Sequence, residues 1–159
     1  MKMMYCTLLG TLAIVSMIGG PAVAEDVRVP VHVEGNKPIA PYSPGIKLAN
    51  GMLFVSGQIP YVNGEIPEAA RNDVAAQTRI VMENLQSVLN EAGYSFDDVV
   101  RATVFMTDMK NYGAFNKVYG TYWGDGSVPP ARAAVEVGAL PGSKPGAPVL
   151  VEVSMIAAK

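Results

Sequence analysis

The spacing of apolar residues predicts a β-hairpin followed by a long helix in the first half of the chain. Two arms rich in β-branched and large apolar residues flank Asn50-Gly51. This dipeptide favours a type I′ turn because both central positions need positive φ, so residues 46–59 are predicted to form a hairpin. Between residues 69 and 92 the apolar positions recur at steps of three and four, and Gly93 follows. That spacing is typical of an amphipathic helix that ends at a glycine cap.

The second half of the chain predicts a strand, a second helix and two further strands. Residues 99–107 alternate with a period of two, as in a half-buried strand. Residues 112–123 place aromatic side chains on one helical face, and residues 132–137 and 149–156 are apolar runs joined by a loop rich in glycine and proline. This order predicts an α+β domain with two helices packed on one face of a mixed β-sheet. The proline-dotted segment before the hairpin is predicted to be irregular.

The N-terminus has the features of a secretory signal peptide. Lys2 precedes an apolar stretch over about residues 8–18, and the small-residue pattern Ala22-Val23-Ala24 follows. The apolar stretch is shorter than the roughly 20 residues that cross a bilayer, which favours a cleaved signal over a membrane anchor. We expect residues 1–24 to be removed, one domain over residues 25–159, and a periplasmic or secreted protein with no membrane span after cleavage.

Composition and charge exclude several kinds of chemistry in the mature chain. The sequence has 12 basic and 14 acidic side chains and no run of Lys or Arg, so a nucleic-acid-binding surface is not expected. The one cysteine, Cys6, lies in the predicted signal, which excludes disulfides and thiolate chemistry after cleavage. The one histidine, His32, lies in the irregular segment and is interpreted as a solvated side chain. We therefore expect no Ser-His-Asp triad, no metal site and no cofactor.

Two charged residues within apolar strands are the candidates for chemistry. Arg132 opens the run ARAAVEV, and Glu152 lies in VLVEVSMIA. A buried, unpaired charge costs several kcal/mol, so each side chain must face water, a partner or a ligand. Arg132 is either part of a salt bridge, with Glu136 as the obvious partner, or an anion clamp, because a guanidinium group matches a carboxylate bidentately. Glu152 is either an outward-facing strand residue or part of a site.

Several segments along the chain resemble, in the same order, the signatures of a known family. They are PYSPG, VSGQIP, the segment AAQTRIVMENLQSVLNEAGYSFDDVVRATVFMTDM, FNKVY, PPARAAVEV and VEVSMIA. Together they resemble the RidA (YjgF) family of reactive-intermediate enamine/imine deaminases from about residue 41 to residue 157. The resemblance implies a chorismate-mutase-like α+β fold that assembles as a homotrimer, with clefts between neighbouring subunits.

The resemblance also implies an activity and a set of site residues. It implies a 2-iminobutanoate/2-iminopropanoate deaminase-like hydrolase, which converts 2-imino or enamine acids to 2-oxo acids and ammonia. Arg132 matches the arginine that holds the substrate carboxylate, and Glu152 matches a glutamate that positions water. Tyr42, Gly57 and Asn116 match positions that line the cleft.

Two other functions remain open at this stage. A trimer could bind small carboxylate metabolites in the same cleft without turnover, and Glu152 separates this alternative from catalysis. An RNA-cleaving role is a label sometimes attached to the family, and the acidic composition argues against it.

Two features depart from the family pattern. The loop 138–148 is longer than the usual connection to the final strand, and Ser154 stands where many members carry a second acid. A longer loop could shift Glu152 or reshape the rim of the cleft, so this loop bears directly on the role of the glutamate.

The first prediction concerns export. In a bacterial host with a periplasm, the mature protein should begin at Glu25 and be found in the periplasmic fraction, because cleavage follows the small-residue pattern. Mass spectrometry of the N-terminal peptide in each fraction measures this. Ala24→Leu, which removes the small residue at the cleavage point, should leave the chain uncleaved. An intact Met1 on a cytoplasmic protein would contradict the prediction.

Overall fold

Six strands form one mixed sheet. The computed structural model describes residues 27–35, 38 and 40–159, so the predicted signal peptide lies outside the described residues. In spatial order the sheet is β1-β2-β3-β6-β4-β5. β4 and β5 are parallel, and every other neighbouring pair is antiparallel. The strands are β1 (Arg28–Val31), β2 (Gly45–Leu48), β3 (Met52–Gln58), β4 (Val99–Met106), β5 (Ala131–Glu136) and β6 (Val151–Ala158).

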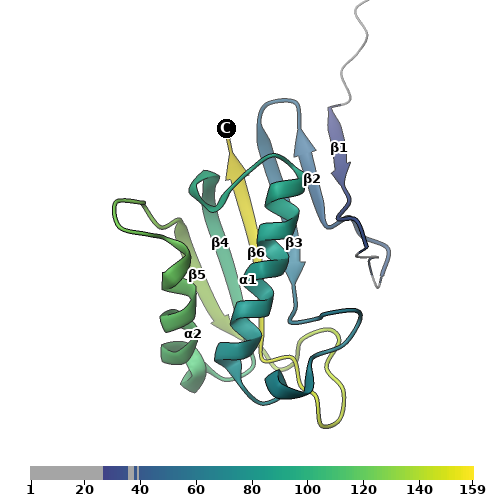
Figure 1. Cartoon of the computed structure of the whole chain (residues 1–159), viewed down its shortest axis with the longest axis vertical. Coiled ribbons are helices and arrows are strands. Elements are labelled where there is room, and N and C mark those ends of the chain that lie inside the picture. The colour runs from purple at the N-terminus through teal and green to yellow at the C-terminus, as the bar shows by residue number, and fades with distance from the viewer. Residues whose placement is uncertain (1–26, 36–37, 39) are drawn as a thin grey trace, which may run out of the picture.

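Both α-helices of the described chain lie on one face of this sheet, which confirms the predicted α+β layering (Figure 1). They are α1 (Val74–Glu91) and α2 (Tyr112–Tyr119). Four short 3-10 helices link the elements: η1 (Glu68–Ala70), η2 (Phe96–Asp98), η3 (Met109–Asn111) and η4 (Gly120–Tyr122). The parallel pair β4 and β5 is connected through α2, as parallel strands require a crossover.

The strict alternation of β6 separates the two faces of the sheet. Its buried residues face the helices and form the core together with apolar residues of α1, β3 and β4. The intervening residues of β6 face the opposite side. The core-facing set is Val151, Val153, Met155 and Ala157, and the opposite set begins with Glu152 and Ser154. Successive residues of β6 therefore face two different surfaces of the sheet.

The predicted irregular segment contains a strand that the sequence reading missed. β1 pairs with β2 and includes Pro30. Proline cannot donate to a strand ladder, but β1 is the outermost strand, so the missing N–H group costs no pairing. The interpretation of this segment as irregular throughout was therefore wrong.

Element ends also differ from the prediction. α1 begins at Val74 rather than near residue 69, because the Asp73 carboxylate caps the helix by accepting hydrogen bonds from the backbone N–H groups of Ala75 and Ala76 at 2.8 and 3.1 Å. The second helix ends at Tyr119 and tightens into η4 rather than continuing as one α-helix to residue 123.

Within β4, the predicted alternation fails at one end. A strict alternation over residues 99–107 places Val100 on the same face as the buried Ala102 and Val104, yet Val100 is 49% exposed. The register between β4 and β6 shifts between Val99 and Arg101, so Val99 takes the buried place instead.

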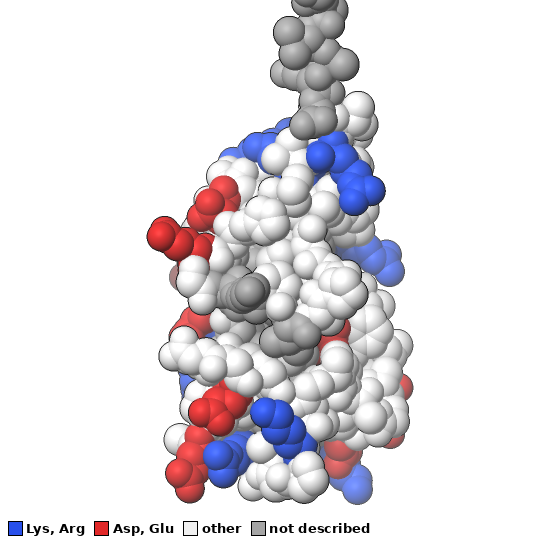
Figure 2. Space-filling model, turned by 90° about the vertical axis from the view of Figure 1, so that its right-hand side faces the viewer, with Lys and Arg blue, Asp and Glu red and all other residues white. Residues whose placement is uncertain are grey.

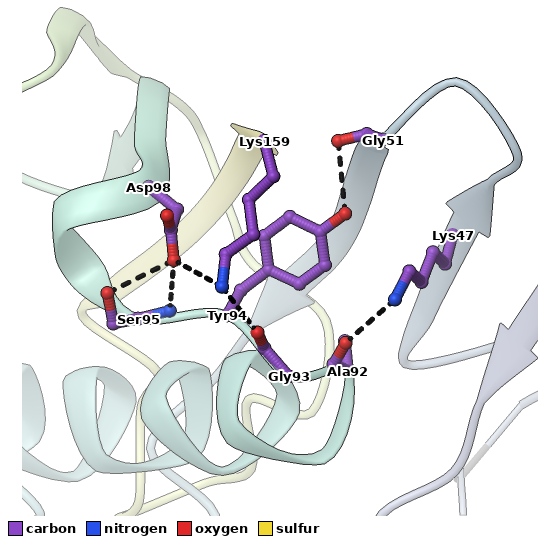
Figure 3. A network of polar contacts seen from close by, with 8 residues as sticks. All are labelled: Lys47, Gly51, Ala92, Gly93, Tyr94, Ser95, Asp98 and Lys159. Atoms are coloured by element: carbon purple, nitrogen blue, oxygen red, sulfur yellow. Dashed lines mark hydrogen bonds and ion pairs between the residues drawn. The ribbon is translucent and has the colours of Figure 1, made fainter.

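Two lysines hold the C-terminal end of α1 (Figure 3). Lys47 donates a hydrogen bond to the carbonyl oxygen of Ala92 at 3.3 Å. Lys159 donates to the carbonyl oxygen of Gly93 at 2.7 Å and forms an ion pair with Asp98 at 3.4 Å. Cations at this position complement the partial negative charge at the end of a helix. These charged groups therefore have a structural role.

Charges of both signs are spread over the surface seen in Figure 2, which looks onto the molecule from the side of β1. Lysine, arginine, aspartate and glutamate side chains lie around its margins, and a broad uncharged area lies between them. Lysine and arginine side chains gather along the upper and right margin of this face, and acidic side chains lie along its left and lower margins. None of the helices in the described part of the chain is long and apolar enough to cross a membrane.

Gln77 ties the start of α1 to the start of β6. Its side chain is completely buried. Its Oε1 accepts a hydrogen bond from the backbone N–H of Leu150 at 2.8 Å. Its Nε2 donates to the carbonyl oxygens of Ala70, Arg71 and Pro148 at 3.1, 3.2 and 2.9 Å. One amide group thus lies within hydrogen-bond distance of four backbone groups from two distant segments of the chain.

The second prediction tests this tie. Gln77→Met keeps an unbranched side chain but leaves buried backbone groups without partners, so the free energy of unfolding should fall by about 3 kcal/mol. Gln86→Met is the matched control, because Gln86 lies exposed on the same helix, and it should change the free energy by less than about 0.5 kcal/mol. Chemical denaturation measures both. If the two substitutions lower the free energy of unfolding equally, the hydrogen bonds of the buried Gln77 amide do not stabilise the fold.

Candidate functional site

Glu152 lies over Gly57, on the face of the sheet opposite the helices. Glu152 pairs with Phe105 of β4. Gly57 lies at a register shift in β3. A β-carbon at position 57 would lie 1.9 Å from the carboxylate oxygen Oε1 of Glu152. The carboxylate therefore occupies space that only a glycine at position 57 leaves free.

The environment of Glu152 makes its carboxyl group easier to protonate than usual. The side chain is half-buried, and burial raises its pKa above the ordinary 4.5. Burial is the only cause of this shift, since no neighbouring charge of the described chain contributes. A carboxylate of this kind is suited to accept a proton from water.

Tyr42 and Gly57 line a cavity of about 640 Å³ that Glu152 does not line. Asn84 of α1 and Tyr61 also contribute to its wall. Tyr42 is 44% exposed. The contact with Glu152 is that of Gly57, and we call Gly57 and Glu152 the glutamate half-site.

Arg132 lies on the other face of the sheet, against the aromatic side of α2. Its Cζ atom is 4.6 Å from the ring centroid of Tyr119, 5.5 Å from that of Tyr112 and 5.6 Å from that of Phe115. Its Nη2 donates a hydrogen bond to the hydroxyl oxygen of Tyr112 at 2.9 Å. Aromatic faces attract cations, which lets the guanidinium group stay charged while half-buried.

A pocket of about 450 Å³ opens beside Arg132. Asn116 and Arg132 line it, together with Tyr119, Trp123 and Pro130. Burial raises the pKa of Tyr119 to about 12, and the positive charge of Arg132 opposes this shift. Tyr119 is thus a neutral aromatic wall at neutral pH. We call Asn116 and Arg132 the arginine half-site.

The salt bridge between Arg132 and Glu136, one of the two alternatives left open by the sequence, is absent from the described chain. The Glu136 carboxylate instead accepts a hydrogen bond from the backbone N–H of Met109 at 2.7 Å. Among the described residues the ion pair is that of Lys159 with Asp98, so no carboxylate neutralises Arg132. The guanidinium group therefore keeps N–H donors free to bind an anion.

The five residues singled out from the sequence do not meet within one chain. Arg132 pairs with Ala102 of β4, which is buried under the helices, whereas Glu152 pairs with Phe105, three residues further along β4 and on the other face. Successive strand residues alternate between faces, so the sheet itself separates the arginine and glutamate half-sites. A site that uses both needs a second copy of the chain.

The long loop before Glu152 is folded back on itself. Lys144 and Ala147 exchange backbone hydrogen bonds, and the Tyr61 hydroxyl donates to the carbonyl oxygen of Gly142 at 2.5 Å. Leu140, within the loop, is buried in a small second core. Contacts of Gly142 with Tyr61, of Leu140 with the second core and of Pro148 and Leu150 with Gln77 thus hold the loop in place. Glu152 keeps a regular position in β6.

The described residues contain no group of three or more His, Cys, Asp or Glu side chains that could hold a metal ion. Arg132 offers a cation that can bind a carboxylate, and Glu152 offers a carboxylate that can accept a proton from water.

A family model described as Endoribonuclease L-PSP matches residues 34–159. The chain belongs to this family. Curated relatives include a RutC family protein from Pyrococcus horikoshii, 44% identical over 77% of this chain and 90% of the relative. Another is the mitochondrial protein mmf1 of Schizosaccharomyces pombe, 38% identical over 79% of this chain and 74% of the relative.

Several solved structures are similar to this chain in fold and in sequence. A Rid family protein, YyfA from Yersinia pestis, is 36% identical with a TM-score of 0.73, over 83% of this chain and 99% of that one. The E. coli YjgF gene product is 32% identical with a TM-score of 0.69, over 81% and 96% of the two chains. E. coli TdcF with bound serine is 32% identical with a TM-score of 0.71, over 82% and 98%. The resemblance to the RidA (YjgF) family is thereby confirmed.

Sequence reasoning missed residues that surround these half-sites. Tyr112 and Tyr119 were assigned to the aromatic face of a helix, and nothing in that spacing indicated that they would hold an arginine. Gln77 was not noted at all, although a polar residue within an apolar helical stripe was the available signal.

The third prediction uses the pKa of Glu152. Because burial raises this pKa, the folded protein binds the proton more tightly than the unfolded chain, so ionisation of Glu152 destabilises the fold. The penalty is present above the raised pKa and disappears as the pH falls below the ordinary 4.5. Glu152→Gln cannot ionise, and it should therefore raise the midpoint of thermal unfolding at neutral pH, with a gain that shrinks on acidification.

Thermal unfolding followed by circular dichroism between neutral pH and about pH 4 measures this difference. Glu91→Gln, which removes an exposed carboxylate at the end of α1, controls for the change in net charge. If the increase in the unfolding midpoint of Glu152→Gln grows on acidification, the prediction is contradicted.

Proposed function

We propose that the protein hydrolyses 2-imino or enamine acids to 2-oxo acids and ammonia. The observation that carries this proposal is Arg132, a charged guanidinium group with no carboxylate partner in the described chain, held between aromatic rings at an open pocket. Its planar fork matches a substrate carboxylate. The resemblance to the RidA (YjgF) family implies the same class of substrate.

The chemistry requires few side chains, because an imine is already electrophilic. Arg132 binds the carboxylate, and Glu152 accepts a proton from water as the water oxygen attacks the carbon of the protonated imine, C=NH2⁺. The resulting carbinolamine has a hydroxyl and an amino group on the same carbon. Glu152 returns the proton to the nitrogen, the C–N bond breaks, ammonia leaves, and loss of the hydroxyl proton gives the 2-oxo acid. The raised pKa of Glu152 suits both transfers.

We propose that the site is completed between copies in a homotrimer, with the arginine half-site of one chain facing the glutamate half-site of its neighbour. The sheet face opposite the helices supports this assembly, because it leaves Phe54 and Val135 41% and 44% exposed in a single chain. Exposed apolar side chains on a sheet face favour association. The resemblance to the RidA (YjgF) family favours the trimer among closed assemblies.

One alternative has support from a relative. The E. coli TdcF structure contains bound serine, an amino acid that carries a carboxylate. A trimer that captures small carboxylates without turnover would use Arg132 in the same way and would not need the proton transfers of Glu152.

Two further expectations remain proposals. We propose that the mature protein acts in the periplasm or outside the cell, on the basis of the features of residues 1–24. The description of the family model names an endoribonuclease, but the excess of acidic over basic side chains favours a small-molecule substrate over RNA.

The fourth prediction separates these functions. With imines generated in situ from amino acids by an amino-acid oxidase, the wild-type protein should accelerate imine loss. Arg132→Lys keeps the charge but loses the fork, so kcat/KM should fall by about two orders of magnitude. Glu152→Gln should lower kcat by at least about tenfold. Arg79→Lys, a matched change at an exposed position of α1, should leave the rate unchanged.

Mixing the two impaired variants tests the shared site. If each cleft takes one half-site from each of two chains, dissociation and reassembly of Arg132→Lys with Glu152→Gln should restore part of the activity, since some clefts then combine two intact halves. Light scattering checks the trimeric mass. Retained binding of carboxylates with no wild-type turnover would instead favour the capture function, and cleavage of RNA without imine hydrolysis would favour the nuclease.

A further inference from the structure

The aromatic surroundings of Arg132 fix the position of its guanidinium group but not its rotation. The contacts to the rings of Tyr119, Tyr112 and Phe115 span 4.6 to 5.6 Å from Cζ. Cation–π attraction arises from the charge of the cation over a ring and constrains its distance from the ring. A bidentate contact to a carboxylate depends in addition on how the fork is turned within its own plane, because two N–H groups must point in parallel at two oxygens.

One hydrogen bond supplies this missing constraint. Arg132 Nη2 donates to the Tyr112 hydroxyl at 2.9 Å, whereas the buried Tyr119 hydroxyl has no partner within hydrogen-bond geometry in the described chain. Tyr112 is the first residue of α2, and its ring packs against the main core. The hydroxyl is therefore a fixed point against which the fork is turned.

The bond also leaves enough donors for a ligand. A guanidinium group has five N–H donors, and the bond to Tyr112 uses one of them. Tyr112 and Arg132 both line the pocket of about 450 Å³. The remaining donors of Arg132 include pairs that could contact a carboxylate in that pocket.

We infer that Tyr112 is a positioning residue for the substrate clamp: its hydroxyl holds the guanidinium fork of Arg132 in the orientation that receives the carboxylate. The inference rests on the proposed role of Arg132. It adds to that role a specific hydroxyl group, on a different element, that acts through the arginine.

Tyr112→Phe removes this hydroxyl and keeps the ring, its core packing and its contact to the cation. Relative to wild type, KM for the imine should rise about tenfold, while kcat changes by less than about twofold, because the loss weakens carboxylate binding rather than proton transfer. The Kd of pyruvate, a 2-oxo acid that is not turned over, should rise by a similar factor in an NMR titration. The midpoint of thermal unfolding should stay near that of wild type.

Tyr122→Phe is the matched control. The Tyr122 hydroxyl contacts only the carbonyl oxygen of Arg79, at 3.5 Å, among the described residues, and Tyr122 does not line the pocket. This variant should match wild type in KM and Kd. In the Arg132→Lys background, Tyr112→Phe should have little further effect, because the group that it positions is gone.

The two readouts separate this inference from the proposed hydrolysis. If wild type binds pyruvate but hydrolyses no imine, the proposed hydrolysis fails, and the Kd of Tyr112→Phe still decides the role of Tyr112. An unchanged KM and Kd in Tyr112→Phe, with or without a lower unfolding midpoint, would overturn the inference. If the wild-type protein does not bind pyruvate, both the inference about Tyr112 and the proposed role of Arg132 as a carboxylate clamp are overturned.

Discussion

The buried amide of Gln77 is the constraint on which the placement of the final strand depends. It joins the backbone just before α1 to the backbone at the entry of β6, through hydrogen bonds to carbonyl oxygens and to the Leu150 N–H group. Glu152 follows two residues later. Backbone groups buried this deeply must find partners, so the chain has one low-energy way to enter β6. A long and glycine-rich loop can therefore precede a glutamate whose position is fixed.

The sheet places the two candidate charged groups of one chain on opposite surfaces. Arg132 sits among aromatic rings under α2, where its charge is stabilised without a counter-ion. Glu152 sits on the bare face, where burial without a cationic partner favours its protonated form. Within one chain the two groups therefore do not neutralise each other.

Much of the fold follows from local patterns in the sequence, whereas the site does not. The hairpin around Asn50-Gly51, the two helices and the final strand were predicted because each depends on neighbours in the sequence. The type I′ turn was wrong, because Gly51 has a positive φ of 81° and Asn50 does not have a positive φ. β1 was missed because Pro30 argues against a strand unless its place at the sheet edge is known. Arg132 and Glu152 were selected as charges within apolar strands, and Tyr42, Gly57 and Asn116 through a family resemblance. Only the register of distant strands shows which of these residues lie together.

The close approach of Glu152 to Gly57 limits how this surface can change over evolutionary time. A side chain at position 57, even a methyl group, would meet the carboxylate, whose Oε1 lies 1.9 Å from where that β-carbon would stand. The flexible glutamate would then have to turn away, while the strand itself could remain intact. Most substitutions at this glycine would thus be nearly silent for folding and severe for the carboxylate. A lineage could retain a stable protein of this fold while losing, in a single step, the arrangement that distinguishes this surface.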